Sequence, residues 1–385
     1  MLTFLRRASL GITIALAVLG LFLGGFVHGE LGSVATQAAT ILFGLVAPTL
    51  LVMIVLFAAV AIFLLWKNGG KKLLAVVAVL ALAASSLLAV DLSIYASSIT
   101  SKGGSYNFLT VATGGAMRAV DPVEEVVYAN RDGKDLTVSV YDTGKRKKDA
   151  LAPVYVYNHG GSWTSGTPRD MGMLHTAMAD EGYVSFSISY RLATQGRLDN
   201  PTWDKAIVDV ADAMRWVRDN AERYGGDPDR IVLSGESAGG NLALIYSGKV
   251  SVGDIDGPTP KAVGVMFPAV DIPWIKDNGR YLTPETIPYI VEPYIGGELA
   301  DHPDRVAAIS PLNFMHENLP QTLIIHGEKD ALVTVGGSRD YVAKAKDLGV
   351  QAELVEIPFS HHGTDAQANR SLILNMLDGI EGMRP

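Results

Sequence analysis

The pentapeptide from Gly235 to Gly239, Gly-Glu-Ser-Ala-Gly, fits the pattern G-x-S-x-G. A strand-like apolar run at 231–233 precedes it and a helical pattern from Ala238 follows it, so the sequence predicts a strand–turn–helix elbow with Ser237 at its tip. Such an elbow exposes a serine hydroxyl, and the N-terminus of the following helix supplies positive potential where an oxyanion develops. We therefore predict that Ser237 is a catalytic nucleophile.

A glycine-rich loop with the sequence His-Gly-Gly-Ser-Trp follows the strand-like run at 153–157. Small side chains let backbone N–H groups approach a carbonyl oxygen, so the loop is predicted to form one side of an oxyanion hole. We expect its first residue, His159, to be structural rather than a metal ligand or a second base. The predicted donors are the N–H groups of Gly161, aided by Gly160 or Ser162, and of Ala238, which follows the nucleophile.

An acid and a base are needed beside such a serine, because its hydroxyl is a poor nucleophile until a base takes the proton and an acid orients that base. Asp330 follows one strand-like run in the sequence His-Gly-Glu-Lys-Asp, and the pair His361-His362 follows the next. We assign Asp330 as the acid and His362 as the base. Glu328 and His361 are the alternatives.

Strand-like and helical patterns alternate around these motifs. The strand-like runs cover residues 125–128, 136–141, 153–157, 183–187, 231–233, 262–267, 322–325 and 351–357, and amphipathic helical patterns cover 171–180, 203–224, 238–249, 338–348 and 366–379. The early runs have no helix between them and predict hairpins, whereas the later alternation predicts an α/β fold with a mostly parallel sheet covered on both faces. In such a sheet the site lies at the carboxyl ends of the strands.

Residues 120–385 resemble the α/β-hydrolase superfamily, and within it esterases of the hormone-sensitive-lipase and feruloyl-esterase-like kind. The order Ser237, Asp330, His362 matches that superfamily. The resemblance also implies that His362, rather than its neighbour, holds the catalytic position. Ser162 replaces the usual third glycine of the oxyanion loop but retains a backbone N–H. Besides the motifs above, the likeness rests on the segments 189–192 (SYRL), 224–230 (YGGDPDR), 294–297, 310–312 and 358–365.

The resemblance implies hydrolysis of small-molecule or lipid-like carboxylic esters through an acyl-enzyme, with no metal and no cofactor. Two alternatives are a serine peptidase of the prolyl-oligopeptidase-like kind and a catalytically inactive, membrane-anchored binding protein. The segment 272–311 is expected to help shape the pocket. Its aromatic side chains are either pocket walls or ordinary surface and core residues: Trp274, Tyr281, Tyr289 and Tyr294.

Composition excludes several other classes of protein. The chain has no cysteine, which excludes a disulfide scaffold, a thiol enzyme and zinc–thiolate or iron–sulfur sites. Residues 1–102 hold six basic and two acidic side chains, whereas 26 basic and 38 acidic side chains follow. Phosphate contacts need a basic face, so the acidic main part argues against a nucleic-acid partner.

Three segments without charged residues dominate the first 100 positions, and the sequence predicts a membrane anchor with helices at 8–27, 41–66 and 73–95. About 20 apolar residues suffice to cross the hydrocarbon core, so the first two segments are long enough and the third reaches that length only by including Asp91. A cleavable signal peptide is the alternative for the first segment. A linker at 101–118 and a catalytic domain at 119–385 complete the predicted organisation.

Basic residues predict the orientation of this anchor. Arg6 and Arg7 precede the first segment, and three lysines lie between the second and third segments. The loop between the first and second segments carries His28 and Glu30 as its only ionisable residues. Lys and Arg accumulate in cytoplasmic loops. The sequence therefore predicts an integral plasma-membrane protein with a cytoplasmic N-terminus and an extracytoplasmic catalytic domain.

Overall fold

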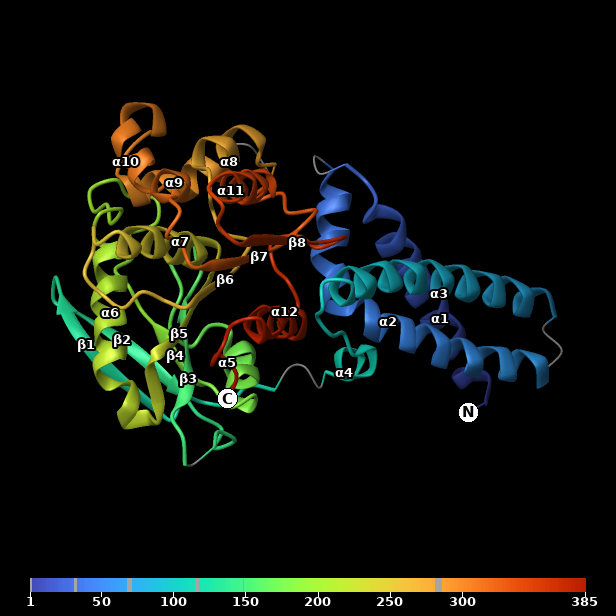
Figure 1. Ribbon diagram of the computed structural model, residues 1–385. Coiled ribbons are helices and arrows are strands. Elements are labelled where there is room, and N and C mark those ends of the chain that lie inside the picture. Colours follow the sequence, from blue (N-terminus) through green and yellow to red (C-terminus); the bar gives the residue numbers. More distant parts are fainter. Residues whose placement is uncertain (1, 31–32, 68–70, 115–117, 148, 281–285) are drawn as a thin grey trace.

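The computed structural model describes residues 2–30, 33–67, 71–114, 118–147, 149–280 and 286–385. A helical bundle formed by the first hundred residues projects from one side of a domain built around a β-sheet (Figure 1). The N-terminus lies at the end of the bundle that is remote from this domain.

The bundle consists of α1 (Leu2–Phe26), α2 (Val34–Lys67) and α3 (Lys71–Thr100). Each contains a stretch long and apolar enough to cross a membrane: Arg7–Phe26, Val46–Lys67 and Lys72–Thr100. The third helix continues well past the predicted end of its span. Asp91 is buried there and lies 3.0 Å from Nε2 of His28. The carboxylate therefore has a polar partner within the bundle.

The sheet has eight strands in the order β1-β2-β4-β3-β5-β6-β7-β8. β1 pairs antiparallel with β2, and β2 pairs antiparallel with β4, while every later pair is parallel. This confirms the predicted α/β class and the hairpin of β1 and β2. A second hairpin, expected between β2 and β3, does not form, because β4 lies between them and β3 pairs in parallel with β4 and β5. The strands are β1 (Glu124–Arg131), β2 (Lys134–Tyr141), β3 (Ala152–Asn158), β4 (Val184–Ile188), β5 (Gly226–Glu236), β6 (Ala262–Met266), β7 (Gln321–Gly327) and β8 (Ala352–Ile357).

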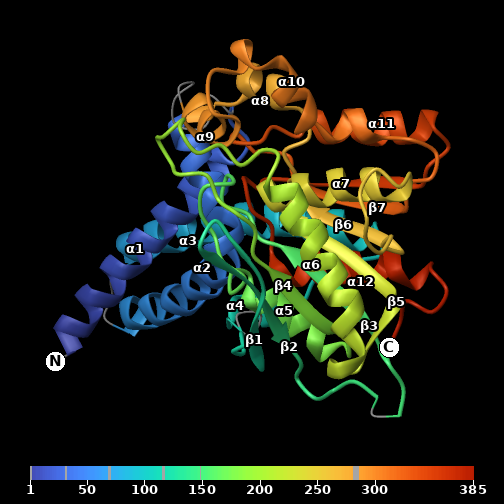
Figure 2. The same ribbon diagram turned by 90° about the vertical axis from the view of Figure 1, so that its left-hand side faces the viewer.

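Helices cover both faces of the sheet (Figures 1 and 2). α5 (Gly172–Asp180) and α12 (Ala366–Asp378) pack together on one face, and α6 (Ala206–Asn220), α7 (Ser237–Ser251) and α11 (Gly336–Asp347) cover the other. β3 and β4 are buried along their whole lengths, as expected for parallel strands covered on both sides. The segment between β6 and β7 adds α8 (Ile272–Asn278), α9 (Thr286–Ile295) and α10 (Pro303–Ala308), with short 3₁₀ turns at Leu299–Asp301 and Pro311–Phe314. A further 3₁₀ turn, Ala221–Tyr224, joins α6 to β5.

Part of the predicted linker is helical and attached to its surroundings. Within it, α4 (Phe108–Ala112) is capped by Asn107, whose side chain accepts a hydrogen bond from the Thr110 N–H. Thr49 of α2 donates a 3.0 Å hydrogen bond to the carbonyl of Ala112, and the N–H of Ser105 donates to Ser371 of α12. Satisfied backbone groups of this kind hold the connection against both the bundle and the domain.

The end of the bundle nearest the domain shares a hydrophobic core with it. Buried side chains of all three long helices belong to one contiguous cluster with Tyr157, Ile325 and Leu372 of the domain. Gln37 of α2 adds a 2.7 Å hydrogen bond to the carbonyl of Arg280. Contact through a common core means that α2 is a wall of the catalytic domain as well as a helix of the bundle.

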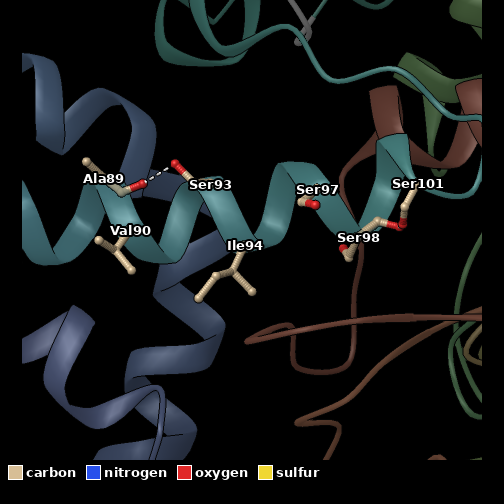
Figure 3. A pocket seen from close by; sticks show the side chains of 7 residues that line it. All are labelled: Ala89, Val90, Ser93, Ile94, Ser97, Ser98 and Ser101. Carbon is tan, nitrogen blue, oxygen red and sulfur yellow. Dashed lines mark hydrogen bonds between the residues drawn. The ribbon is translucent and has the colours of Figure 1, made fainter.

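A shallow groove of about 590 Å³ runs along α3 (Figure 3). It is lined partly by Ser93, Ser97, Ser98 and Ser101, and Ser93 donates a 2.6 Å hydrogen bond to the carbonyl of Ala89. Serine hydroxyls in a helix commonly bond in this way to the preceding turn. The groove has no ionisable side chain in its wall and belongs to a single helix, so it is not a reaction site.

Candidate active site

Ser237 lies at a sharp turn between β5 and α7. Its φ is 51°, a left-handed conformation that a non-glycine residue adopts only under local constraint. The flanking glycines are required by space: a Cβ on Gly239 would lie 2.1 Å from the Asn158 carbonyl oxygen, and one on Gly235 would lie 2.6 Å from Gly239. The G-x-S-x-G pattern thus lets the strand and helix meet closely enough to project the hydroxyl above the sheet.

A chain of hydrogen bonds connects this serine to two distant residues. Nε2 of His362 lies 3.0 Å from Oγ of Ser237, and Nδ1 of the same ring lies 2.7 Å from Oδ2 of Asp330. The three residues follow β5, β7 and β8, whose carboxyl ends lie at one edge of the sheet. With Nδ1 protonated, the imidazole donates to the carboxylate and presents a lone pair to the serine hydroxyl, which is the arrangement of an activated nucleophile.

Asp330 is fully buried and held by four donors. Its Oδ1 accepts 2.9 Å hydrogen bonds from the N–H groups of Leu332 and Val333, while Nε2 of His326 lies 3.2 Å from the Oδ2 that also bonds His362. Burial by itself raises the pKa of Asp330, but His362 and His326 outweigh it, and the resulting pKa lies well below the ordinary value. The carboxylate therefore stays ionised.

His362 is poised to accept a proton. Burial lowers the pKa of its imidazole, yet the Asp330 carboxylate outweighs burial and raises this pKa above the ordinary 6.5, with a smaller contribution from Glu236. The ring of Phe267 packs edge-on against the imidazole at a centroid distance of 4.7 Å. This contact fixes the plane of the ring that must face both Ser237 and Asp330.

The loop predicted to bind the oxyanion has an unusual backbone. Gly161, Ser162 and Trp163 have φ values of 105°, 56° and 58° in succession. The N–H groups of Thr164 and Ser165 bond to the Gly161 carbonyl, so these residues form a tight turn, and the successive N–H groups at the start of such a turn can form a concave anion-binding nest. A Cβ on Gly161 would lie 2.2 Å from the carbonyl oxygen of Ser165, so this position requires glycine, whereas the next position accommodates serine.

The side chains of His159 and Glu236 lie beside this loop. His159 is buried, its Nδ1 lies 2.7 Å from the carbonyl of Gly160, and its ring stacks on Tyr190 at 4.4 Å. Burial lowers the pKa of His159, which suits a neutral structural residue. Glu236 lies on the other side, where a Cβ on Gly160 would be 3.0 Å from its Cγ, and burial raises the pKa of its carboxyl.

Glu328 and His361, the alternatives for the acid and the base, lie elsewhere in the structure. Glu328 is exposed, and its N–H donates to the carbonyl of Ile357. His361 is buried beside the catalytic loop, where burial lowers the pKa of its imidazole. Neighbouring residues on an extended segment point in different directions, so only one ring of the pair faces Ser237. The structure places His362 there.

A small cavity adjoins the nucleophile, and we call it the Ser237 cavity. Its volume is about 20 Å³, and Ser237, Ser162 and Trp163 form one side of it. The segment 272–311 does line it, but with aliphatic side chains instead of the aromatic candidates. The remaining wall residues are Ala269, Ile272, Ile275, Ile290, Val291, Leu332 and Val333.

The aromatic candidates lie elsewhere. Trp274 and Tyr289 are 41% and 53% exposed, and neither lines the Ser237 cavity. Tyr294 is buried behind the wall, with its ring stacked on Trp163 at 4.6 Å. Tyr281 lies outside the described residues. The stacked pair fixes Trp163, which explains how Tyr294 acts on the pocket without facing it.

A larger cavity, which we call the α2 cavity, lies between the bundle and the loop of His362. Its volume is about 250 Å³. The domain contributes Met173 and the loop residues 360–366, while the bundle side contributes the rest: Thr40, Ile41 and Gly44 of α2, Tyr95 of α3 and Val111 of α4. No sequence motif indicated this cavity, because its walls come from segments far apart in the chain, such as residues 40–44 and 360–366.

Three supporting residues were not recognised from the sequence. His326 had a signal, since it begins the motif that contains Asp330, and its ring also bonds Ser338 and the Val333 carbonyl. Phe267 and Glu236 had no sequence signal beyond their positions next to strand ends. Within the part of the chain that the structure describes, no group of three His, Asp or Glu side chains is arranged to hold a metal ion.

An eight-stranded, mostly parallel sheet with a serine elbow and a Ser–His–Asp chain at its carboxyl edge defines the class of α/β-hydrolases. Residues 139–344 match the BD-FAE family, and the chain belongs to that family. The bundle lies outside the matched region.

Named relatives agree with this class. The chain is similar to esterase LipQ of Mycobacterium tuberculosis, with 30% identity over 221 residues covering 56% of this chain and 51% of LipQ. It is also similar to carboxylesterase NlhH of the same organism, with 30% identity covering 55% of this chain and 66% of NlhH. The chain thus spans between half and two thirds of these curated relatives.

A solved esterase extends the comparison to three dimensions. The esterase Est2 from Thermogutta terrifontis, in its propionate-bound structure, is 26% identical and superposes with a TM-score of 0.54. The similarity covers 68% of this chain and 95% of Est2. It therefore reaches almost the whole of Est2 and leaves about a third of this chain unmatched.

Proposed function

We propose that this chain is a serine hydrolase that cleaves carboxylic esters through an acyl-enzyme, with Ser237, His362 and Asp330 as its catalytic triad. The observation that carries the proposal is the pair of hydrogen bonds at 3.0 and 2.7 Å that connects the three side chains. Esterase activity in the named relatives supports the choice of ester over amide substrates.

The reaction follows from the geometry. His362 Nε2 takes the proton of Ser237 as Oγ attacks the acyl carbon, and Asp330 stabilises the imidazolium that forms. The N–H groups of Gly161 and Ala238, with that of Ser162, hold the oxyanion of the tetrahedral intermediate. His362 then gives its proton to the leaving alcohol oxygen. Water, deprotonated by the same nitrogen, releases the acid and restores the serine.

The size of the Ser237 cavity supports a short acyl group. A volume of about 20 Å³ is close to that needed for one water-sized sphere. The Est2 structure cited above contains propionate, a three-carbon acid, in an enzyme of the same fold. We therefore place acetyl and propionyl esters ahead of long-chain acyl esters.

The test compares Ser237→Ala with Ser251→Ala, which alter the first and last residues of α7. In the full-length protein, Ser237→Ala should reduce kcat for p-nitrophenyl acetate by about 10⁴-fold or more and abolish labelling by a fluorophosphonate probe. Ser251→Ala should retain both. Unchanged turnover in a correctly folded Ser237→Ala protein, judged by its Tm, would reject the assignment.

We further propose that the three long helices anchor the enzyme in the plasma membrane with the N-terminus in the cytoplasm. The N-terminal end of α1, the last turn of α2 and the first turn of α3 lie at the bundle end remote from the domain (Figure 1), and these segments contain Arg6, Arg7, Lys67 and Lys72 in the sequence. Basic residues favour the cytoplasmic side, so the domain at the opposite end lies outside the cytoplasm.

The absence of cysteine makes this orientation testable with single introduced thiols. Val252→Cys places a thiol on the domain, and Trp66→Cys places one at the remote end of α2; these side chains are 50% and 74% exposed. In intact cells a membrane-impermeant maleimide should label the first variant only. Labelling of the second variant alone would show the opposite topology.

A further inference from the structure

Ser237 and His362, which are hydrogen-bonded to each other, line two different cavities of unequal size. The Ser237 cavity, about 20 Å³, lies on the side of the nucleophile, and the α2 cavity, about 250 Å³, is lined by His362 itself. In ester hydrolysis the acyl group becomes attached to the serine, whereas the alcohol oxygen leaves beside the nitrogen that protonates it. The small cavity therefore suits the acyl group and the large one suits the alcohol.

The position of the α2 cavity indicates which class of alcohol it can bind. Gly44 precedes the apolar stretch Val46–Lys67 by two residues, and Tyr95 lies within the corresponding stretch of α3. Ile41, on the cavity wall, is 40% exposed. A cavity at the domain end of three membrane helices lies where the hydrocarbon core meets the headgroups, the level at which amphipathic molecules keep their polar groups.

The bundle contacts the two loops that carry His362 and Asp330. Phe43, next to Gly44, packs edge-on against Phe359 at 5.6 Å, and the chain runs from Phe359 directly into the loop of His362. Lys329, next to Asp330, bonds the Gly29 carbonyl in the connection between α1 and α2. Helices that served only as an anchor would have no need to contact both catalytic loops.

We propose that the α2 cavity binds the alcohol part of an amphiphilic ester drawn from the membrane, so that the substrates are short-chain acyl esters of lipid-like alcohols. This inference rests on the proposed esterase function. Oγ of Ser237 bonds to the acyl carbon as the ester C–O bond breaks, and His362 protonates the departing lipid alcohol in the α2 cavity. Water then releases the short acid.

Gly44 offers a direct test, because a Cβ added there meets no atom within 4 Å. Gly44→Leu fills space in the α2 cavity without a backbone clash. Gly25→Leu is the matched control: this glycine lies on exposed α1 surface and also has no atom within 4 Å of an added Cβ. Ile41→Trp narrows the same cavity from a neighbouring position and provides a second variant.

The experiment uses full-length protein in phosphatidylcholine vesicles with two acetate esters, hexadecyl acetate in the bilayer and p-nitrophenyl acetate in water. The measured quantity is the ratio of their kcat/KM values. Gly44→Leu and Ile41→Trp should each lower this ratio by about tenfold, because a filled hydrophobic site rejects the bulky alcohol selectively. Gly25→Leu should leave the ratio unchanged.

A ratio that stays constant in Gly44→Leu and Ile41→Trp while both variants remain active would overturn the inference and leave the esterase function standing. Failure of the unaltered enzyme to cleave either acetate would overturn the esterase function, and the inference with it. The two failures are therefore distinguishable in one set of measurements.

Discussion

Phe43 of α2 and Phe359 of the catalytic loop pack edge to face with their ring centroids 5.6 Å apart. Both are buried, and His28 adds a second edge-on contact to Phe359 at 4.9 Å. Phe359 itself has a φ of 62°, a left-handed conformation that is unfavourable for an aromatic residue. Contacts from the bundle thus hold a strained residue three positions before the proposed catalytic base.

Phe43→Ala should consequently weaken both stability and catalysis. Removing a buried phenylalanine costs about 3 kcal/mol of unfolding free energy and should lower Tm by about 5 °C or more. Loosening of the histidine loop should lower kcat for p-nitrophenyl acetate by about tenfold. Phe63→Ala, on the same helix but 55% exposed, is the control for a lost aromatic ring. Equal effects of the two substitutions on kcat would show that the Phe43 contact has no specific role.

The substitution Asp330→Asn tests whether Asp330 or Glu328 is the acid that orients His362. An amide keeps the shape of the side chain but favours the wrong imidazole tautomer, so kcat should fall by about 10³- to 10⁴-fold. Glu328→Gln should retain activity within about threefold because Glu328 is exposed and outside the hydrogen-bond chain. Steady-state kinetics at one pH suffice, and the reverse pattern would make Glu328 the acid.

The pH profile should report the proposed base. His362 must be neutral to take the serine proton, and its pKa is raised above 6.5 by Asp330 and, to a smaller extent, Glu236. Hence kcat/KM should fall as pH decreases through an apparent pKa above 6.5 that belongs to the coupled groups. Glu236→Gln removes a negative charge that favours the imidazolium, so its acid limb should move to lower pH. An acid limb that moves to higher pH in this variant would contradict the assignment.

Gly161→Ala tests the oxyanion loop. The added Cβ would collide with the Ser165 carbonyl at 2.2 Å, so the backbone must move and displace the N–H groups of the nest. Loss of one oxyanion donor costs about 10²- to 10³-fold in kcat. Gly144→Ala is matched, since its φ of 73° imposes similar backbone strain but its Cβ meets nothing within 4 Å. It should lower stability by about 1 kcal/mol and leave kcat unchanged.

The local sequence was sufficient to predict the α/β class and the strand that precedes each motif. Apolar runs, helical periodicity and turn glycines are short-range signals, and they predicted the strands of the sheet to within about three residues at each end, except that β5 begins about five residues before the predicted run. The serine elbow could be predicted for the same reason: Gly235 and Gly239 permit a close strand–helix contact within five residues. Charge-free segments and flanking basic residues likewise predicted three apolar helices.

Other features depend on contacts between distant segments, and only the tertiary structure decided them. His361 and His362 are equivalent in type and spacing, and which ring faces Ser237 depends on how the loop after β8 is held by Phe43 and Phe267. The part of the pocket wall that 272–311 contributes is aliphatic because packing, not residue type, determines which side chains of this segment line the Ser237 cavity. Tyr106 and Phe108 of the predicted linker pack against the shared core because burial of apolar surface at the bundle end outweighs the freedom of a flexible connection.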